Sequence, residues 1–175
     1  MKKCLLTILL ICVCSIIHAQ SFVGGTIGYA LETDGDGHHT THSFVVAPEA
    51  GYNFNKTWAL GVSLPVNCSN IYDNTVTTIS LMPYLRSTFA RAGKVDFFGE
   101  LALGYGWAIN DGDATGVFQA GLRPGFLVNI SDKFGLVFRT TLLGYSNYHS
   151  DGSDNFDVID FSIGNNFAAG VQFTF

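Results

Sequence analysis

Hydrophobic and polar side chains alternate with a period of two along most of the chain after about residue 20. The clearest example is the final stretch, residues 158–175. One set of alternating positions there is apolar except for Asn165, and the other set is small or polar throughout. Such alternation is typical of a β-strand whose two faces have different surroundings. We expect the apolar face to meet lipid and the small, polar face to fill a narrow interior.

Eight stretches of the chain show this pattern. They cover residues 22–31, 42–54, 57–67, 75–91, 95–109, 116–130, 133–146 and 158–175. Most of them exceed the roughly 9–11 residues that a tilted strand needs to cross a bilayer. Since backbone groups in lipid must all be paired, the pattern predicts an all-β fold, an eight-stranded antiparallel up-and-down transmembrane β-barrel.

Short and long connections alternate between these stretches. The short ones are residues 55–56, 92–94 and 131–132, and the longer ones are 32–41, 68–74, 110–115 and 147–157. An even number of strands then places the short turns and both strand termini on one side, as in outer-membrane barrels with periplasmic turns and extracellular loops. The longer connections contain nine acidic residues and no Lys or Arg, whereas Lys56, Arg91, Lys94 and Lys133 lie near the short turns.

All four prolines fall within predicted strands: Pro48, Pro65, Pro83 and Pro124. A proline lacks the N–H that a strand with two neighbours must donate, so we expect bulges or strand breaks there. The main structural alternative is a soluble, lipocalin-like eight-stranded barrel with the opposite polarity. Its apolar faces would enclose a ligand, and the inward charges described below would lie outside.

The first residues predict a signal peptide, residues 1–19. Lys2 and Lys3 precede a short apolar run, and strand pattern follows at once. We therefore expect one mature domain, residues 20–175, with Cys68 as its single cysteine and no internal disulfide. Removal of the two lysines leaves 7 basic against 14 acidic residues, which argues against nucleic acid as a partner.

With these features, the chain resembles the small OmpA/OmpX-like outer-membrane β-barrel family, often described as porin-family outer membrane proteins. The resemblance covers the whole mature region and implies localisation in the bacterial outer membrane after secretion through the inner membrane. It also implies outer-membrane lipid and lipopolysaccharide as partners, and a monomeric barrel. The closing residues Val171, Phe173 and Phe175 are similar to the signal that the barrel-assembly machinery reads in this family.

Five charged residues fall on the predicted inner faces, at similar heights from the periplasmic end. They are Glu49, Arg86, Glu100, Arg123 and Arg139. We expect them to form one interior polar network, with Tyr84, Gln119, Asn129, Asn166 and Gln172 as further polar partners. Two interpretations stay open: a salt-bridged plug that fills the lumen, or a narrow gated pore that opens when the pairs switch.

The longer connections also carry residue types found in metal and catalytic sites. Residues 34–42 contain two Asp and three His, and 111–116 resemble the start of an EF-hand loop, but Leu122 stands where that loop needs Glu. His149, Ser150 and Asp151 are the residue types of a hydrolytic triad, and some eight-stranded barrels modify lipid A. Adjacent loop residues seldom converge as a triad must, so we predict no enzymatic activity. Because neither loop pattern forms a complete metal site, we also predict no metal and no cofactor.

The sequence therefore predicts a small integral outer-membrane barrel with a structural or surface-interaction role and a lumen plugged by side chains. A narrow gated pore for small solutes or ions is the second interpretation. A lipid A-modifying enzyme is the third.

Overall fold

The computed structural model describes residues 20–33, 40–71, 74–110, 113–149, 156–161 and 166–175. Nearly all of these residues lie in β-strands, and the strands form one antiparallel sheet. Within these ranges, no helix is both long and apolar enough to cross a bilayer.

The described part of the chain contains eleven strand segments. Their bounds are β1 Gln20–Thr33, β2 Thr40–Asn53, β3 Trp58–Ser63, β4 Val66–Ile71, β5 Asn74–Ala92, β6 Val95–Asn110, β7 Asp113–Ser131, β8 Phe134–Thr140, β9 Leu143–His149, β10 Phe156–Phe161 and β11 Asn166–Thr174. Three of the predicted stretches are each divided in two, as β3 with β4, β8 with β9, and β10 with β11. The eleven segments therefore make up the eight antiparallel spans of a closed barrel, which confirms the predicted fold class.

The barrel closes between the first and last strands. In β1 and β11, Phe22 lies opposite Thr174 and Ala30 lies opposite Asn166, with the register unbroken between them. The amide of Phe175 extends this ladder by donating to the carbonyl of Ser21 over 2.9 Å. On its other side β11 pairs with β8, which also pairs with β7. The predicted pairing of the closing strand with the first strand is confirmed.

Large apolar side chains lie outside the barrel and small or polar ones inside. In β6, for example, Leu101 and Trp107 are more than half exposed, whereas Glu100 and Ala102 on either side of Leu101 are fully buried. The same alternation runs along β3. This polarity is that of a transmembrane barrel and is the reverse of what the lipocalin-like alternative requires.

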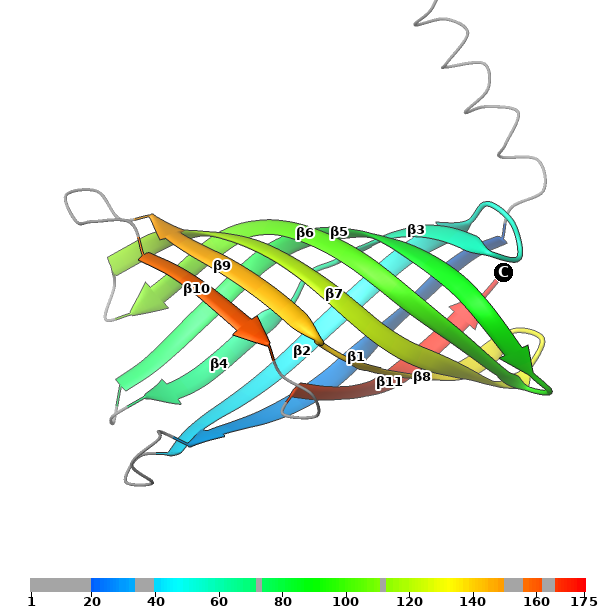
Figure 1. Ribbon diagram of the computed structural model, residues 1–175, viewed down its shortest axis with the longest axis horizontal. Coiled ribbons are helices and arrows are strands. Elements are labelled where there is room, and N and C mark those ends of the chain that lie inside the picture. Colours follow the sequence, from blue (N-terminus) through cyan, green and yellow to red (C-terminus); the bar gives the residue numbers. More distant parts are fainter. Residues whose placement is uncertain (1–19, 34–39, 72–73, 111–112, 150–155, 162–165) are drawn as a thin grey trace, which may run out of the picture.

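The ends of the barrel differ in their connections (Figure 1). One end carries the C-terminus and the short turns between β2 and β3, β5 and β6, and β7 and β8. Gly93 takes a positive φ of 62° in the turn between β5 and β6, a conformation that most other residues adopt only with strain. The paired ends of β1 with β2, β4 with β5, and β6 with β7 lie at the other end, where the sequence predicted long connections.

Two of those long connections are shorter than predicted. Strands β4 and β5 stay paired as far as Ile71 and Asn74, and β6 and β7 as far as Asn110 and Asp113. The predicted loops 68–74 and 110–115 are therefore largely strand. Most of their residues are polar, as expected where a strand projects into water and no longer needs an apolar side, so alternation could not reveal them.

Two prolines coincide with a break between β3 and β4, as expected. Pro65 lies in the gap between these strands, and Pro48 on β2 lies opposite the gap and accepts from the amide of Leu64 over 3.0 Å. The proline nitrogens cannot donate across this seam, which is why the ladder is interrupted there.

A third proline faces an inserted residue. From Leu122 to Gly125 the strand β7 advances three residues, while its neighbour advances four, from Arg139 to Leu143. The extra residue shifts the phase of the alternation, so Leu143 also faces outward, which the predicted alternation did not include. Pro124 lies within this interval. Pro83, by contrast, lies in continuous β5, and the register shifts near Ala90 and Ser131 are away from the prolines.

Candidate functional site

Three charged side chains form a row across neighbouring strands inside the barrel. In the sheet register, Arg86 on β5 lies directly opposite Glu100 on β6, and Glu100 lies directly opposite Arg123 on β7. Directly opposed residues on one face of a sheet have their Cβ atoms about 5 Å apart, so their side chains meet. The inward face of these strands therefore places a carboxylate between two guanidinium groups.

Glu100 is the centre of the network and is fully buried. Arg86 Nε donates to Glu100 Oε1 over 2.9 Å, and Arg86 Nη2 lies 2.8 Å from the same oxygen. Arg123 Nη2 lies 2.9 Å from Glu100 Oε2, and Arg139 Nη1 lies 3.4 Å from it. Three cations thus converge on one carboxylate that water does not reach, which compensates its loss of hydration.

Glu49 and Arg139 extend the network to the opposite wall. Arg139 on β8 donates from Nη1 to Glu49 Oε2 over 2.8 Å and from Nη2 to the hydroxyl of Thr26 over 2.8 Å. Tyr84 also donates to Glu49 Oε2, over 3.1 Å. Because β1 and β11 lie between β2 and β8 in the sheet order, these contacts span part of the lumen and do not join adjacent strands.

Aromatic rings surround Arg86. Its guanidinium carbon lies 4.3 Å from the ring centroid of Phe98, 5.5 Å from that of Phe22 and 5.6 Å from that of Tyr84. The faces of aromatic rings attract a cation, so these contacts help to hold the charge away from water. Gln172 on β11 completes the surroundings, since its Oε1 accepts from Arg86 Nη1 over 2.8 Å.

Glycines make room for these rings. A Cβ at Gly61 would lie 2.3 Å from Cζ of Tyr84, and one at Gly51 would lie 2.3 Å from Cζ of Phe22. Both distances are far below van der Waals contact, so the rings lie flat over backbone that carries no side chain. These inward glycines therefore leave the space that the aromatic side chains occupy in the lumen.

We name this set of five residues, Glu49, Arg86, Glu100, Arg123 and Arg139, the charge layer. It contains three guanidinium groups and two carboxylates, a net charge of +1. The arginines are not held equally: the side chains of Arg86 and Arg139 are 5% and 4% exposed, and that of Arg123 is 12% exposed. Arg123 Nε has no hydrogen-bond partner among the described residues.

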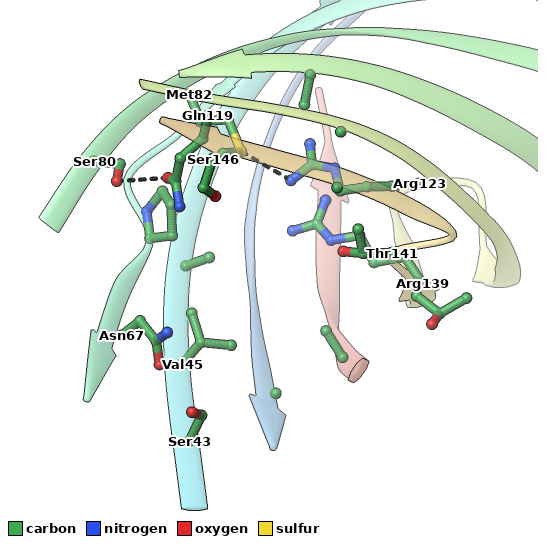
Figure 2. Close-up of a pocket in the computed structure, with 18 of the residues that line it drawn as sticks. Ser43, Val45, Asn67, Ser80, Met82, Gln119, Arg123, Arg139, Thr141 and Ser146 are labelled. Atoms are coloured by element: carbon green, nitrogen blue, oxygen red, sulfur yellow. Dashed lines mark hydrogen bonds between the residues drawn. The ribbon is translucent and has the colours of Figure 1, made fainter. Parts of the chain in front are cut away.

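A hollow lies on each side of the charge layer. The one toward the long connections has a volume of about 320 Å³ and is bounded by Arg123 and Arg139. Figure 2 shows these two arginines projecting from β7 and β8 into that hollow, with Arg123 close to Met82. The other hollow, of about 510 Å³, opens toward the short turns and is bounded by Arg86 and Gln172. The charge layer thus separates two spaces within one lumen.

The structure brings all five predicted charged residues together, but not all their predicted partners. Tyr84 and Gln172 contact the charge layer. Gln119 does not, because its Oε1 accepts from Ser80 over 2.9 Å, nor does Asn129, which donates to Asp96 Oδ2 over 3.0 Å near the short turns. The side chain of Asn166 lies outside the described residues.

Sequence reasoning missed four residues that contact the arginines: Phe22, Thr26, Met82 and Phe98. Phe22 and Phe98 occupy inward positions where neighbouring residues are small or polar. A large aromatic residue on such a face indicates that side chains fill the lumen. The alternation alone places these two phenylalanines on the inner face, so this indication was available from the sequence. The thioether of Met82 accepts from Arg123 Nη1 over 3.5 Å, a contact that no sequence pattern indicates.

The other candidate residues lie mainly outside the described part. This holds for the Asp and His of residues 34–39, for Asp111, and for Ser150 and Asp151 of the possible triad. His149, at the end of β9, is exposed. In the parts of the chain that the structure describes, no three His, Cys, Asp or Glu side chains group as metal ligands.

The residues compared with an assembly signal end the chain. Val171, Phe173 and Phe175 all project from the outer surface, and Phe175 is 72% exposed. Their position beside β1 at the end with the short turns follows from the register. Recognition by assembly machinery stays a prediction.

Comparison with known proteins agrees with this architecture. In a search of curated proteins nothing matches. Among solved structures, Neisserial surface protein A superposes with a TM-score of 0.56 at 14% identity over 89% of this chain and 97% of that chain. OprG of Pseudomonas aeruginosa gives 0.54 at 11% over 90% and 95%, and OprH of the same organism gives 0.51 at 16% over 89% and 99%. At such identities the likeness establishes the fold alone.

The family comparison covers nearly the whole chain. The model of the family described as outer membrane protein beta-barrel domain matches residues 6–175. This family implies the bacterial outer membrane as the location, in accord with the apolar outer surface. The chain belongs to the outer membrane protein β-barrel domain family.

Proposed function

We propose that this protein is a non-enzymatic barrel with a structural or surface-interaction role in the outer membrane, and that the charge layer plugs its lumen. The observation that carries the proposal is the fully buried Glu100, held by arginines from three strands. The interior of a small barrel is filled by side chains, and here the filling is both charged and aromatic. Phe22, Tyr84 and Phe98 occupy the space around it.

Single-channel recording tests the plug. The protein, refolded in detergent and inserted into a planar bilayer, should give no discrete conductance steps at moderate voltage. A porin inserted under the same conditions serves as a positive control for insertion and recording. Regular openings of the unmodified protein would contradict the plug.

A narrow gated pore is the second candidate, and the two hollows favour it. Among the described residues, the charge layer and its aromatic neighbours lie between the hollow bounded by Arg123 and the one bounded by Arg86. Rearrangement of a few side chains would join the two spaces, whereas a uniformly filled lumen would need a larger change. Voltage-dependent openings in the same recordings would support this candidate.

Lipid and lipopolysaccharide are the partners that the outer surface fits best. Exposed apolar side chains cover the spans on the outside, and several are aromatic, such as Trp58, Trp107 and Phe167. We expect a monomer in detergent, and assembly in cells through the barrel-assembly machinery. Unchanged lipid A mass after overexpression would agree with a non-enzymatic role, and a modified lipid A would contradict it.

A further inference from the structure

The hollow bounded by Arg123 has an unusual lining for its position in the barrel. Among the described residues that line it are two arginines, several neutral polar side chains such as Ser43, Asn67 and Thr78, and no carboxylate. Its volume of about 320 Å³ is at the lower end of the range of small-molecule sites. A charged solute that enters this hollow therefore contacts two arginines and neutral hydrogen-bonding groups.

The neighbouring charge layer has one more cation than anion. Arg86 makes short contacts with Glu100 and Gln172, and Arg139 makes short contacts with Glu49 and Thr26. Arg123 has one short ion pair, with Glu100, one contact to a thioether sulfur, which is a weak acceptor, and the ring of Tyr84 at 5.3 Å. The excess positive charge is thus located at Arg123, at the floor of the hollow.

An excess charge that is largely withdrawn from water is unfavourable, so a counter-ion is stabilised beside it. Nε of Arg123 has no hydrogen-bond partner among the described residues, and Nη2 beside it is engaged only in the 2.9 Å ion pair with Glu100. These adjacent nitrogens form the edge of a guanidinium that can bind a carboxylate with two parallel bonds. Both atoms are covered at present, so binding through this edge requires the guanidinium to turn toward the hollow and to exchange Glu100 for the ligand. The thioether contact that restrains it on that side is weak.

We propose that this hollow is a binding site for a small monovalent oxyanion, a short carboxylate of the size of acetate, with Arg123 as its principal ligand. The excess charge of +1 matches one negative charge. Exposed acidic side chains near this end of the barrel, Asp113 and Asp157, disfavour the entry of anions with several charges. The site does not depend on whether the lumen conducts.

The test measures the urea unfolding midpoint of the full barrel in a zwitterionic detergent against acetate concentration, at constant ionic strength maintained with sodium sulfate. A ligand that binds only the folded state stabilises it by an amount that saturates with concentration. We expect a saturable rise in the midpoint that is lost in Arg123→Gln and kept in Arg91→Gln. Arg91 is a matched control because it lies outside this hollow, near the short turns.

A second measurement needs no variant: saturation-transfer NMR should detect the acetate methyl group on the unmodified barrel, with competition by formate. Absence of both the saturable rise and the transfer would overturn the proposal, as would an identical acetate response in Arg123→Gln. Asp160→Asn provides a further arm, because Asp160 on β10 is in register with Gly144, which lines the hollow. Acetate dependence that appears only in this variant would show that the chain supplies its own counter-charge, and would also overturn the site.

Discussion

Replacement of Glu100 by Gln is the most direct test of the charge layer. The substitution keeps the size and shape of the side chain and removes the one carboxylate that contacts all three arginines. The network then contains three guanidinium groups and only Glu49 as a counter-charge. Because Glu100 is fully buried, water cannot replace the lost interactions without opening the lumen.

The magnitude follows from the contacts. Two unit charges about 4 Å apart interact by about 4 kcal/mol at an effective dielectric constant of about 20. Glu100 has two arginines within 2.9 Å and a third at 3.4 Å, so the attraction lost is on the order of 10 kcal/mol. The variant also avoids burying a carboxylate, which offsets several kcal/mol. We therefore expect a net destabilisation of about 3–5 kcal/mol, typical of a broken buried ion pair.

The assay is reversible urea unfolding of the barrel in detergent, followed by tryptophan fluorescence. Asp96→Asn is the matched control, since it removes the acid of a pair with Arg91 whose side chains are 19% and 44% exposed. Solvent screens such a pair, so its loss should change the free energy of unfolding by less than about 1 kcal/mol. If Glu100→Gln does not fold, Glu100→Asp keeps the charge and should fold with an intermediate stability. Equal effects of Glu100→Gln and Asp96→Asn would refute the reasoning.

Two further predictions concern the packing and the topology. Gly61→Ala should destabilise the barrel by about 1–3 kcal/mol in the same assay, because the new methyl group would overlap the ring of Tyr84. Gly99→Ala, which meets nothing within 4 Å, should leave the midpoint nearly unchanged, and an equal effect would contradict the packing argument. In a background whose exposed cysteine is serine, Asp113→Cys should react with an impermeant maleimide on intact cells and Thr57→Cys should not. The reverse labelling would invert the proposed orientation.

The membrane-spanning halves of the strands could be predicted from the sequence because their two faces lie in different environments. In β3, lipid outside and a crowded lumen inside impose the alternation of Trp58 and Leu60 with Ala59 and Gly61. The hairpin ends could not be predicted in this way. Residues such as Ser69 and Thr75 are in strands that water surrounds, so neither face selects apolar side chains.

The charge layer illustrates a different limit. That Arg86, Glu100 and Arg123 face inward followed from the period of two, and their similar heights followed from strand length. Their individual partners depend on the shear of the barrel and on the inserted residue opposite Pro124, neither of which alternation encodes. Glu100 keeps its contacts with Arg86 and Arg139 when Arg123 is removed. Arg123 should therefore be the least costly of the three arginines to replace.

Closure of the lumen and stability of the barrel depend on the same contacts, and this limits how conductance data can be interpreted. A variant such as Glu100→Gln removes the plug and the central ion pair together, so increased conductance could reflect either an opened lumen or local unfolding. Arg123→Gln separates the two, because it widens the floor of one hollow while Glu49 and Glu100 keep two arginines. Conductance that appears in Arg123→Gln at unchanged unfolding midpoint would identify the charge layer as a gate. Closed recordings at unchanged midpoint would leave Arg86, with its aromatic neighbours, as the part that seals the barrel.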